Sequence, residues 1–123
     1  MATIRNARGD ETETLRDIGL RAWEKAMLNV GEMAGIRDNA QAAFDNFTRK
    51  TWLTITVVEK GGVVVGWAAR EALDELISDF WIDPPHQHQG LGSALLSAIK
   101  ADIVRQGFDT ARVETHARND EAV

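Results

Sequence analysis

The chain has 123 residues, with 19 acidic and 14 basic side chains, a formal net charge of -5, and neither cysteine nor tyrosine. The absence of cysteine excludes disulfides, thiolate metal sites and cysteine nucleophiles, and the acidic balance lacks the basic surface that phosphate-backbone binding needs. No apolar run approaches the roughly 20 residues that cross a bilayer, and the N-terminus has no signal-peptide core. We therefore expect a single domain over residues 1–123, cytoplasmic, with no nucleic-acid or membrane partner.

The hydrophobic pattern predicts elements in the order strand, two helices, three strands, helix, strand. A short extended start over 3–7 precedes apolar side chains at helical spacing, which predict a helix over 11–28. We expect a loop over 29–35, followed by a second helix that ends before Thr51.

The second half of the chain alternates β-rich runs with one long helical pattern. Its predicted elements are a strand over 52–59, a turn at 60–62, a strand over 63–69, a strand over 75–82, a helix over 91–106 and a strand over 111–115. Because a helix joins the last two strands, we expect them to be parallel in an otherwise mostly antiparallel sheet flanked by helices, an α/β (α+β) fold. Ligands of such sheets bind beyond the carboxyl ends of strands, where neighbouring strands diverge.

The segment between the strand over 75–82 and the helix over 91–106 contains two glycines at a helix start. Gly90 and Gly92 leave room for a close approach to the backbone, and the first amides of a helix have no intrahelical partner. Together with the helix dipole they favour an anion such as phosphate, although the glycines could instead serve only to shape a tight loop. The pattern is neither a P-loop nor a dinucleotide fingerprint, since no Gly-Lys-Ser/Thr follows and Leu95 occupies the third glycine position.

The same segment resembles a known family motif. Gln87, Gly90 and Gly92 match the Arg/Gln-x-x-Gly-x-Gly/Ala pattern of motif A in the GCN5-related N-acetyltransferase (GNAT) family, and Ile82-Asp83-Pro84 is similar to the strand exit that precedes it. Asn119 and Ala122 fit the Asn-x-x-Ala that opens the family's motif B.

This resemblance implies acetyl transfer from acetyl-CoA, as co-substrate, to an amine of a small molecule or peptide, without a metal. It implies that the backbone of Phe80, Trp81 and Ile82 pairs with the pantetheine and polarises the thioester, and that Asn119 lies near the pantetheine arm. Gln87 belongs to the motif, and the loop amides expected to hold the pyrophosphate are those of His88, Gln89, Gly90, Leu91, Gly92 and Ser93.

Transfer to an amine requires a base, because an alkyl ammonium has a pKa of about 10.4. Glu114 is the first candidate, since it stands five residues before Asn119 as in the branch that acetylates protein N-termini. Asp79 and Glu75 are the others. Each has a plainer alternative: Glu114 as a strand glutamate paired with Arg112 or another neighbour, and Glu75 as a solvent-facing charge. Strand alternation places Asp79 and Trp81 on one face and leaves open which face meets the substrate.

The general acid is not evident, because the family's usual tyrosine is missing from a chain without tyrosine. Water, Ser78 or His116 could protonate the thiolate, the thiolate could leave unassisted, or the chain could be a catalytically weak acyl-CoA-binding or interaction module. His86 and His88 form a polar loop rather than a metal pair.

The resemblance ends four residues after Asn119, where family members continue through a further helix and strands. We therefore expect an incomplete domain whose last strand has an open edge, which a second copy in a homodimer would cover.

Overall fold

The computed structural model describes residues 2–27 and 34–113. The strands are β1 (Ala2–Asn6), β2 (Ile55–Lys60), β3 (Val63–Ala69), β4 (Leu76–Ile77), β5 (Asp79–Ile82) and β6 (Arg112–Val113); the α-helices are α1 (Thr12–Ala26), α2 (Ala34–Thr51) and α3 (Leu91–Arg105); short 3-10 turns span Gly9–Glu11, Trp52–Thr54 and Pro84–His86. Strands β1-β2-β3-β5 form an antiparallel sheet in that order, and β4 pairs in parallel with β6. The mixed α/β architecture predicted from the sequence is confirmed.

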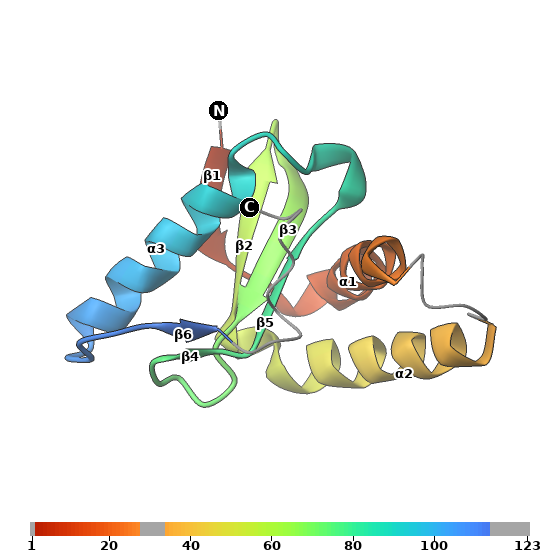
Figure 1. Cartoon of the computed structure of the whole chain (residues 1–123), viewed down its shortest axis with the longest axis horizontal. Helices are drawn as coiled ribbons and strands as arrows, with labels where there is room; N and C mark the ends of the chain where they lie inside the picture. Colours follow the sequence, from red (N-terminus) through yellow and green to blue (C-terminus); the bar gives the residue numbers. More distant parts are fainter. Residues whose placement is uncertain (1, 28–33, 114–123) are drawn as a thin grey trace.

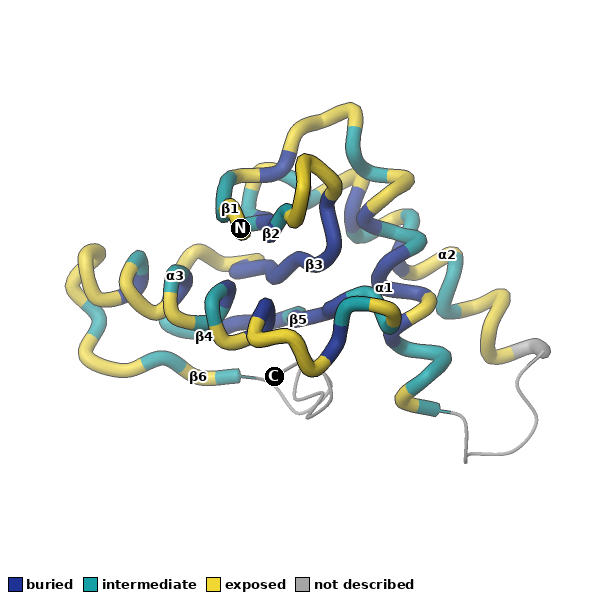
Figure 2. Tube along the Cα trace, turned by 90° about the horizontal axis from the view of Figure 1, so that it is seen from above, coloured by how far each residue is buried: buried dark blue, intermediate teal, exposed yellow. Residues whose placement is uncertain are grey.

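The main sheet lies between two helical layers (Figure 1). Helices α1 and α2 pack together on one side, and α3 lies along the other. Viewed from above, the buried trace of β3 and β5 runs between these layers (Figure 2). No helix in the described ranges is both long enough and apolar enough to cross a bilayer.

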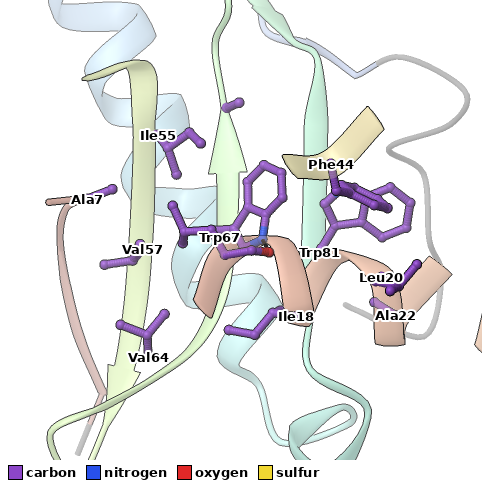
Figure 3. Close-up of a cluster of buried hydrophobic side chains, with 12 residues drawn as sticks. Ala7, Ile18, Leu20, Ala22, Phe44, Ile55, Val57, Val64, Trp67 and Trp81 are labelled. Carbon is purple, nitrogen blue, oxygen red and sulfur yellow. Dashed lines mark hydrogen bonds between the residues drawn. The ribbon is translucent and has the colours of Figure 1, made fainter. Parts of the chain in front are cut away.

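Trp67 is at the centre of the core on the α1–α2 side (Figure 3). Its side chain is fully buried, and its indole N–H donates to the carbonyl oxygen of Leu15 at 2.8 Å. Phe44 of α2 meets the rings of Trp67 and Trp81 edge-on, with centroid distances of 6.3 and 5.4 Å. This cluster fixes the helical pair against β3 and β5.

A second core lies between the sheet and α3. Leu91, Leu95, Ile99 and Ile103 recur every four residues, so they share one face of α3, and all four are buried. Their partners on the strands are Val58, Val65, Ala68, Ile77, Phe80 and Ile82. The helical spacing predicted for 91–106 is therefore confirmed, with Arg105 as the last helical residue.

The second helix and the residues after it differ from the prediction. The helix begins at Ala34 and extends through Thr51, and the hydroxyls of Thr48 and Thr51 donate to the carbonyls of Phe44 and Phe47 one turn earlier. The predicted strand over 52–59 begins only at Ile55, since Trp52–Thr54 forms a 3-10 turn.

The predicted strand over 75–82 is divided at Ser78. Leu76 and Ile77 pair in parallel with Arg112 and Val113, as expected of the last two strands, whereas β5 pairs antiparallel with β3. The chain thus changes neighbour within one extended segment, and among the described strands β5 is at the edge of the main sheet.

Candidate functional site

The free edge of β5 presents backbone hydrogen-bonding groups. The N–H of Asp83 donates to the carbonyl of Val65 at 2.8 Å, and antiparallel ladders alternate, so the N–H and C=O groups of Phe80 and Ile82 point away from β3. Consistently, the carbonyl of Ile82 accepts a hydrogen bond from the Gln87 side chain at 3.0 Å. By the same alternation, the backbone groups of Trp81 face β3. Among the described residues, no strand covers this edge.

The two faces of β5 carry different side chains. Trp81 packs in the cluster beneath α1 and α2, and its indole N–H donates to the Asp79 carboxylate at 3.2 Å. Phe80 and Ile82 are buried against α3. Asp79 is half-buried and shares the face of β5 that carries Trp81, on the α1–α2 side; which face meets the substrate stays open.

A bent loop connects β5 to α3, and at the start of that helix Gly90 and Ser93 are exposed while Leu91 and Gly92 are buried. His88 and Gly90 have positive φ angles of 64° and 79°, and Gly90 is the N-cap of α3 without a side-chain capping hydrogen bond. The amide of Ala94 bonds back to the carbonyl of Gly90 at 3.1 Å, so the amides of residues 91–93 precede the first helical bond. Aligned free amides and the positive end of the helix dipole make this a favourable place for an anion.

Three cationic side chains hold the residues of this loop. Arg21 of α1 forms a two-point ion pair with Asp83 at 2.8 and 2.9 Å, which raises the pKa of the Arg21 guanidinium. Two lysines donate to loop glutamines, each at 2.7 Å: Lys25 to Gln87 and Lys60 to Gln89. Sequence reasoning missed these three cations, because only the four-residue spacing of Arg21 and Lys25 on one helix was visible and their partners lie far away along the chain.

The candidate bases are in different environments. The Glu75 carboxylate is paired with the Arg112 guanidinium at 2.8 Å, and the Arg112 amide also donates to the Glu75 carbonyl. Asp79 accepts the Trp81 indole N–H, as above. Glu114 lies outside the described residues and directly follows β6 in the sequence.

The candidate acids and metal ligands are also only partly placed. The Ser78 hydroxyl is buried and donates to the carbonyl of Ala69 at 3.3 Å, while Asn119 and His116 lie outside the described residues. His86 has a buried Nδ1 atom without a hydrogen-bond partner within the described part of the chain. In that same part, no group of three or more His, Asp or Glu side chains could hold a metal ion.

The chain belongs to the Acetyltransferase (GNAT) family, whose model matches residues 14–123. No curated protein sequence in the comparison matches the chain. Among solved structures, the fold is similar to PaiA N-acetyltransferase from Thermoplasma acidophilum in complex with coenzyme A, with 13% identity, a TM-score of 0.84, and coverage of 97% of this chain and 82% of that one.

Two further solved structures have the same fold. Ard1 from Thermoplasma volcanium is 24% identical with a TM-score of 0.65, over 98% of this chain and 76% of its own. A GCN5-related N-acetyltransferase from Ralstonia eutropha is 18% identical with a TM-score of 0.65, over 94% and 84%. The resemblance inferred from Gln87, Gly90 and Gly92 is thus confirmed as family membership, and the family is one of acetyltransferases.

Proposed function

We propose that the protein transfers an acetyl group from acetyl-CoA to a primary amine. One structural observation supports this most strongly: the edge of β5, which no described strand covers, leads directly into the loop before α3, where the amides of residues 91–93 precede the first helical hydrogen bond. An extended arm that carries amide groups along its length and ends at a diphosphate matches these two surfaces in order. The pantetheine arm of acetyl-CoA is joined to its adenosine by such a diphosphate, and the thioester at the other end of the arm supplies the activated acetyl group.

The residues of β5 provide the polarising group for this chemistry. A backbone N–H aimed at the developing oxyanion stabilises the tetrahedral transition state, and of the two outward N–H groups of β5 we assign this role to that of Phe80. The amine nitrogen attacks the carbonyl carbon, the C–S bond breaks, and CoA leaves as the thiolate. The amine loses its proton to a base, and the thiolate gains one from water or from a group of the protein.

We propose Glu114 and Asp79 as the candidates for that base. Glu114 is supported by its position five residues before Asn119, and Asp79 by its place at the start of β5 with its carboxylate oriented by Trp81. Glu75 is the weaker candidate, because its carboxylate already neutralises Arg112.

Substitution of each carboxylate by its amide tests these assignments. The variant that removes the base should lose about 10²–10⁴-fold in kcat at neutral pH, with a changed pH profile, and Glu75→Gln should retain activity. Rates are followed by release of free CoA thiol against a panel of amines. If Asp79→Asn and Glu114→Gln both keep the wild-type rate and pH profile, neither residue is the base.

Cofactor binding is tested separately by thermal unfolding. Acetyl-CoA at 100 times its dissociation constant should stabilise the fold by about 2.7 kcal/mol. An unchanged melting temperature, together with no heat of binding in calorimetry, would exclude the proposed function.

A catalytically weak acyl-CoA-binding module is the second candidate, favoured by the absence of tyrosine from the sequence. It is supported if acetyl-CoA binds but no thiol is released with small amines, amino acids or peptide N-termini. The homodimer and the cytoplasmic location stay predictions, the first of which sedimentation velocity tests.

A further inference from the structure

Helix α1 is fastened to the loop after β5 at two points. Arg21 and Lys25 lie one helical turn apart, and their partners Asp83 and Gln87 lie on either side of the 3-10 turn Pro84–His86. The two donors are four residues apart on α1, and their two partners are also four residues apart in the loop. Both join segments that are far apart in sequence, so neither helix formation nor strand pairing alone produces them.

Gln87 connects the α1 contact to the sheet, because it bonds both to Lys25 and to the last residue of β5. Its side chain is buried, with 6% of its surface exposed, and both ends of its amide are engaged. The oxygen accepts from the Lys25 ammonium at 2.7 Å, and the nitrogen donates to the carbonyl of Ile82, the last residue of β5, at 3.0 Å. A single buried side chain thus connects α1, the end of β5 and the loop.

The loop conformation needs restraints of this kind. His88 has a φ of 64°, in a backbone region that residues other than glycine seldom occupy without support from their surroundings. Free amides bind an anion well only when they already point to one place, since ordering them at the moment of binding lowers affinity.

We propose that Arg21, Lys25 and Gln87 are positioning residues that hold the loop amides in the arrangement that receives the diphosphate of the acyl donor. This inference rests on the proposed function. Gln87 occupies the Arg/Gln position of the family motif, and here it acts through Ile82 and Lys25 rather than as a side-chain ligand of phosphate. The choice of glutamine follows from Lys25, because an arginine at position 87 would place two cations together.

A charge-exchange cycle tests the link between α1 and the loop. Lys25→Glu removes the donor and Gln87→Arg places like charges together, whereas in the double variant the introduced guanidinium can donate both to the introduced carboxylate and to the Ile82 carbonyl. Each single variant should raise the Kd for CoA and the KM for acetyl-CoA about tenfold, with kcat within about twofold, and the double variant should recover most of the loss. Lys100→Glu, on the exposed face of α3, is the control with the same change in net charge as Lys25→Glu.

A measurement without ligand separates this inference from the proposed function. In the ligand-free protein, the ¹H–¹⁵N heteronuclear NOE of residues 86–90 should fall in both single variants and return in the double variant. If the wild type binds no CoA, the proposed function fails, while the NOE still reports whether α1 orders the loop.

Three results would overturn the inference: single variants with unchanged NOE and unchanged Kd, a double variant no better than the weaker single one, or a loss confined to kcat. If Gln87→Arg does not fold, Lys25→Met is used instead, because it removes the Lys25 ammonium that donates to Gln87 and lies at a partly exposed helical position. It should also raise the Kd for CoA and lower the NOE, and wild-type values for both would contradict the proposal.

Discussion

Gly66 sets how closely β5 lies to β3. It is buried and paired with Ile82, and a Cβ at this position would contact the Ile82 side chain and the Trp81 carbonyl oxygen, the latter at 3.0 Å. A backbone atom cannot move aside as a side-chain end can. The glycine therefore allows β5 to pair closely with β3, and this pairing also sets the position of the outward backbone groups of Phe80.

We expect Gly66→Ala to destabilise the protein by about 1–3 kcal/mol, because overpacking in a buried position forces the strand to shift. Urea unfolding followed by tryptophan fluorescence measures the loss. The displaced β5 should also weaken CoA binding in calorimetry. Wild-type stability in this variant would show that the sheet accommodates the methyl group without strain.

Arg5 joins the first strand to two acidic residues. Its guanidinium donates to both carboxylate oxygens of Glu11, at 2.9 and 2.6 Å, and to Glu59 at 3.0 Å. The hydrogen bonds from Arg5 lower the pKa of Glu11 from its usual 4.5. Because the folded-state pKa is the lower one, the stabilisation is present above the unfolded pKa and is lost as pH falls through the folded pKa.

Glu11→Gln should therefore cost about 1–2 kcal/mol at neutral pH, and this cost should shrink as pH falls through the lowered folded-state pKa of Glu11, where the wild-type carboxylate also becomes protonated. Urea unfolding of both proteins from neutral to acid pH measures the difference. A penalty that is independent of pH would assign the effect to packing rather than to charge.

At the residue scale, the sequence could not distinguish the candidate bases. Glu75 and Asp79 are four residues apart in one β-rich run. Alternation places Asp79 beside Trp81, but nothing in that run shows that Arg112 pairs with Glu75. The Arg112 partner is contributed by a strand that follows α3. Such contacts depend on the folded topology and leave no local pattern.

At the scale of elements, α1 and α3 could be predicted well because their apolar residues recur with the helical period on one face. The division of the predicted strand over 75–82 could not. No glycine or proline interrupts residues 75–82, and the change of partner at Ser78 depends on pairing with β3 on one side and with Arg112–Val113 on the other. The glycine-led start of α3 was visible, since Gly90 and Gly92 punctuate an otherwise apolar pattern.

The left-handed conformation of Gly90 predicts a specific order among substitutions. With φ at 79° and nothing within 4 Å of an added Cβ, an alanine meets no clash, and its cost is conformational, about 1–2 kcal/mol. Asparagine tolerates this region better. We expect Gly90→Ala to reduce both the melting temperature and CoA affinity more than Gly90→Asn, and equal effects of the two would show that backbone conformation is not the cause.

At the scale of the molecule, two apolar cores share one sheet. Leu15 is fully buried on the α1–α2 side and Leu95 is fully buried on the α3 side. Strand β3 contributes to both cores, with Trp67 in the first and Val65 in the second. Loss of either core therefore removes support from the same strand, and the chain should unfold as one unit.

Leu15→Ala and Leu95→Ala should each cost about 2–5 kcal/mol, and the double variant should lose close to the sum because the sites lie on opposite faces of the sheet. Circular dichroism and tryptophan fluorescence should give one coincident transition in urea. Two separate transitions would show that the helical pair and α3 unfold independently.

The pairing of β1 with β2 has a consequence for how the chain is made. Residues 2–6 lie in register with 60–56, and both α1 and α2 are encoded between them. During synthesis the first strand leaves the ribosome with no partner to join, whereas the two helices form from neighbouring residues and can associate at once. A nascent chain halted before Ile55 would thus contain the helical pair and an unpaired first strand, which could join the sheet only after β2 had been made.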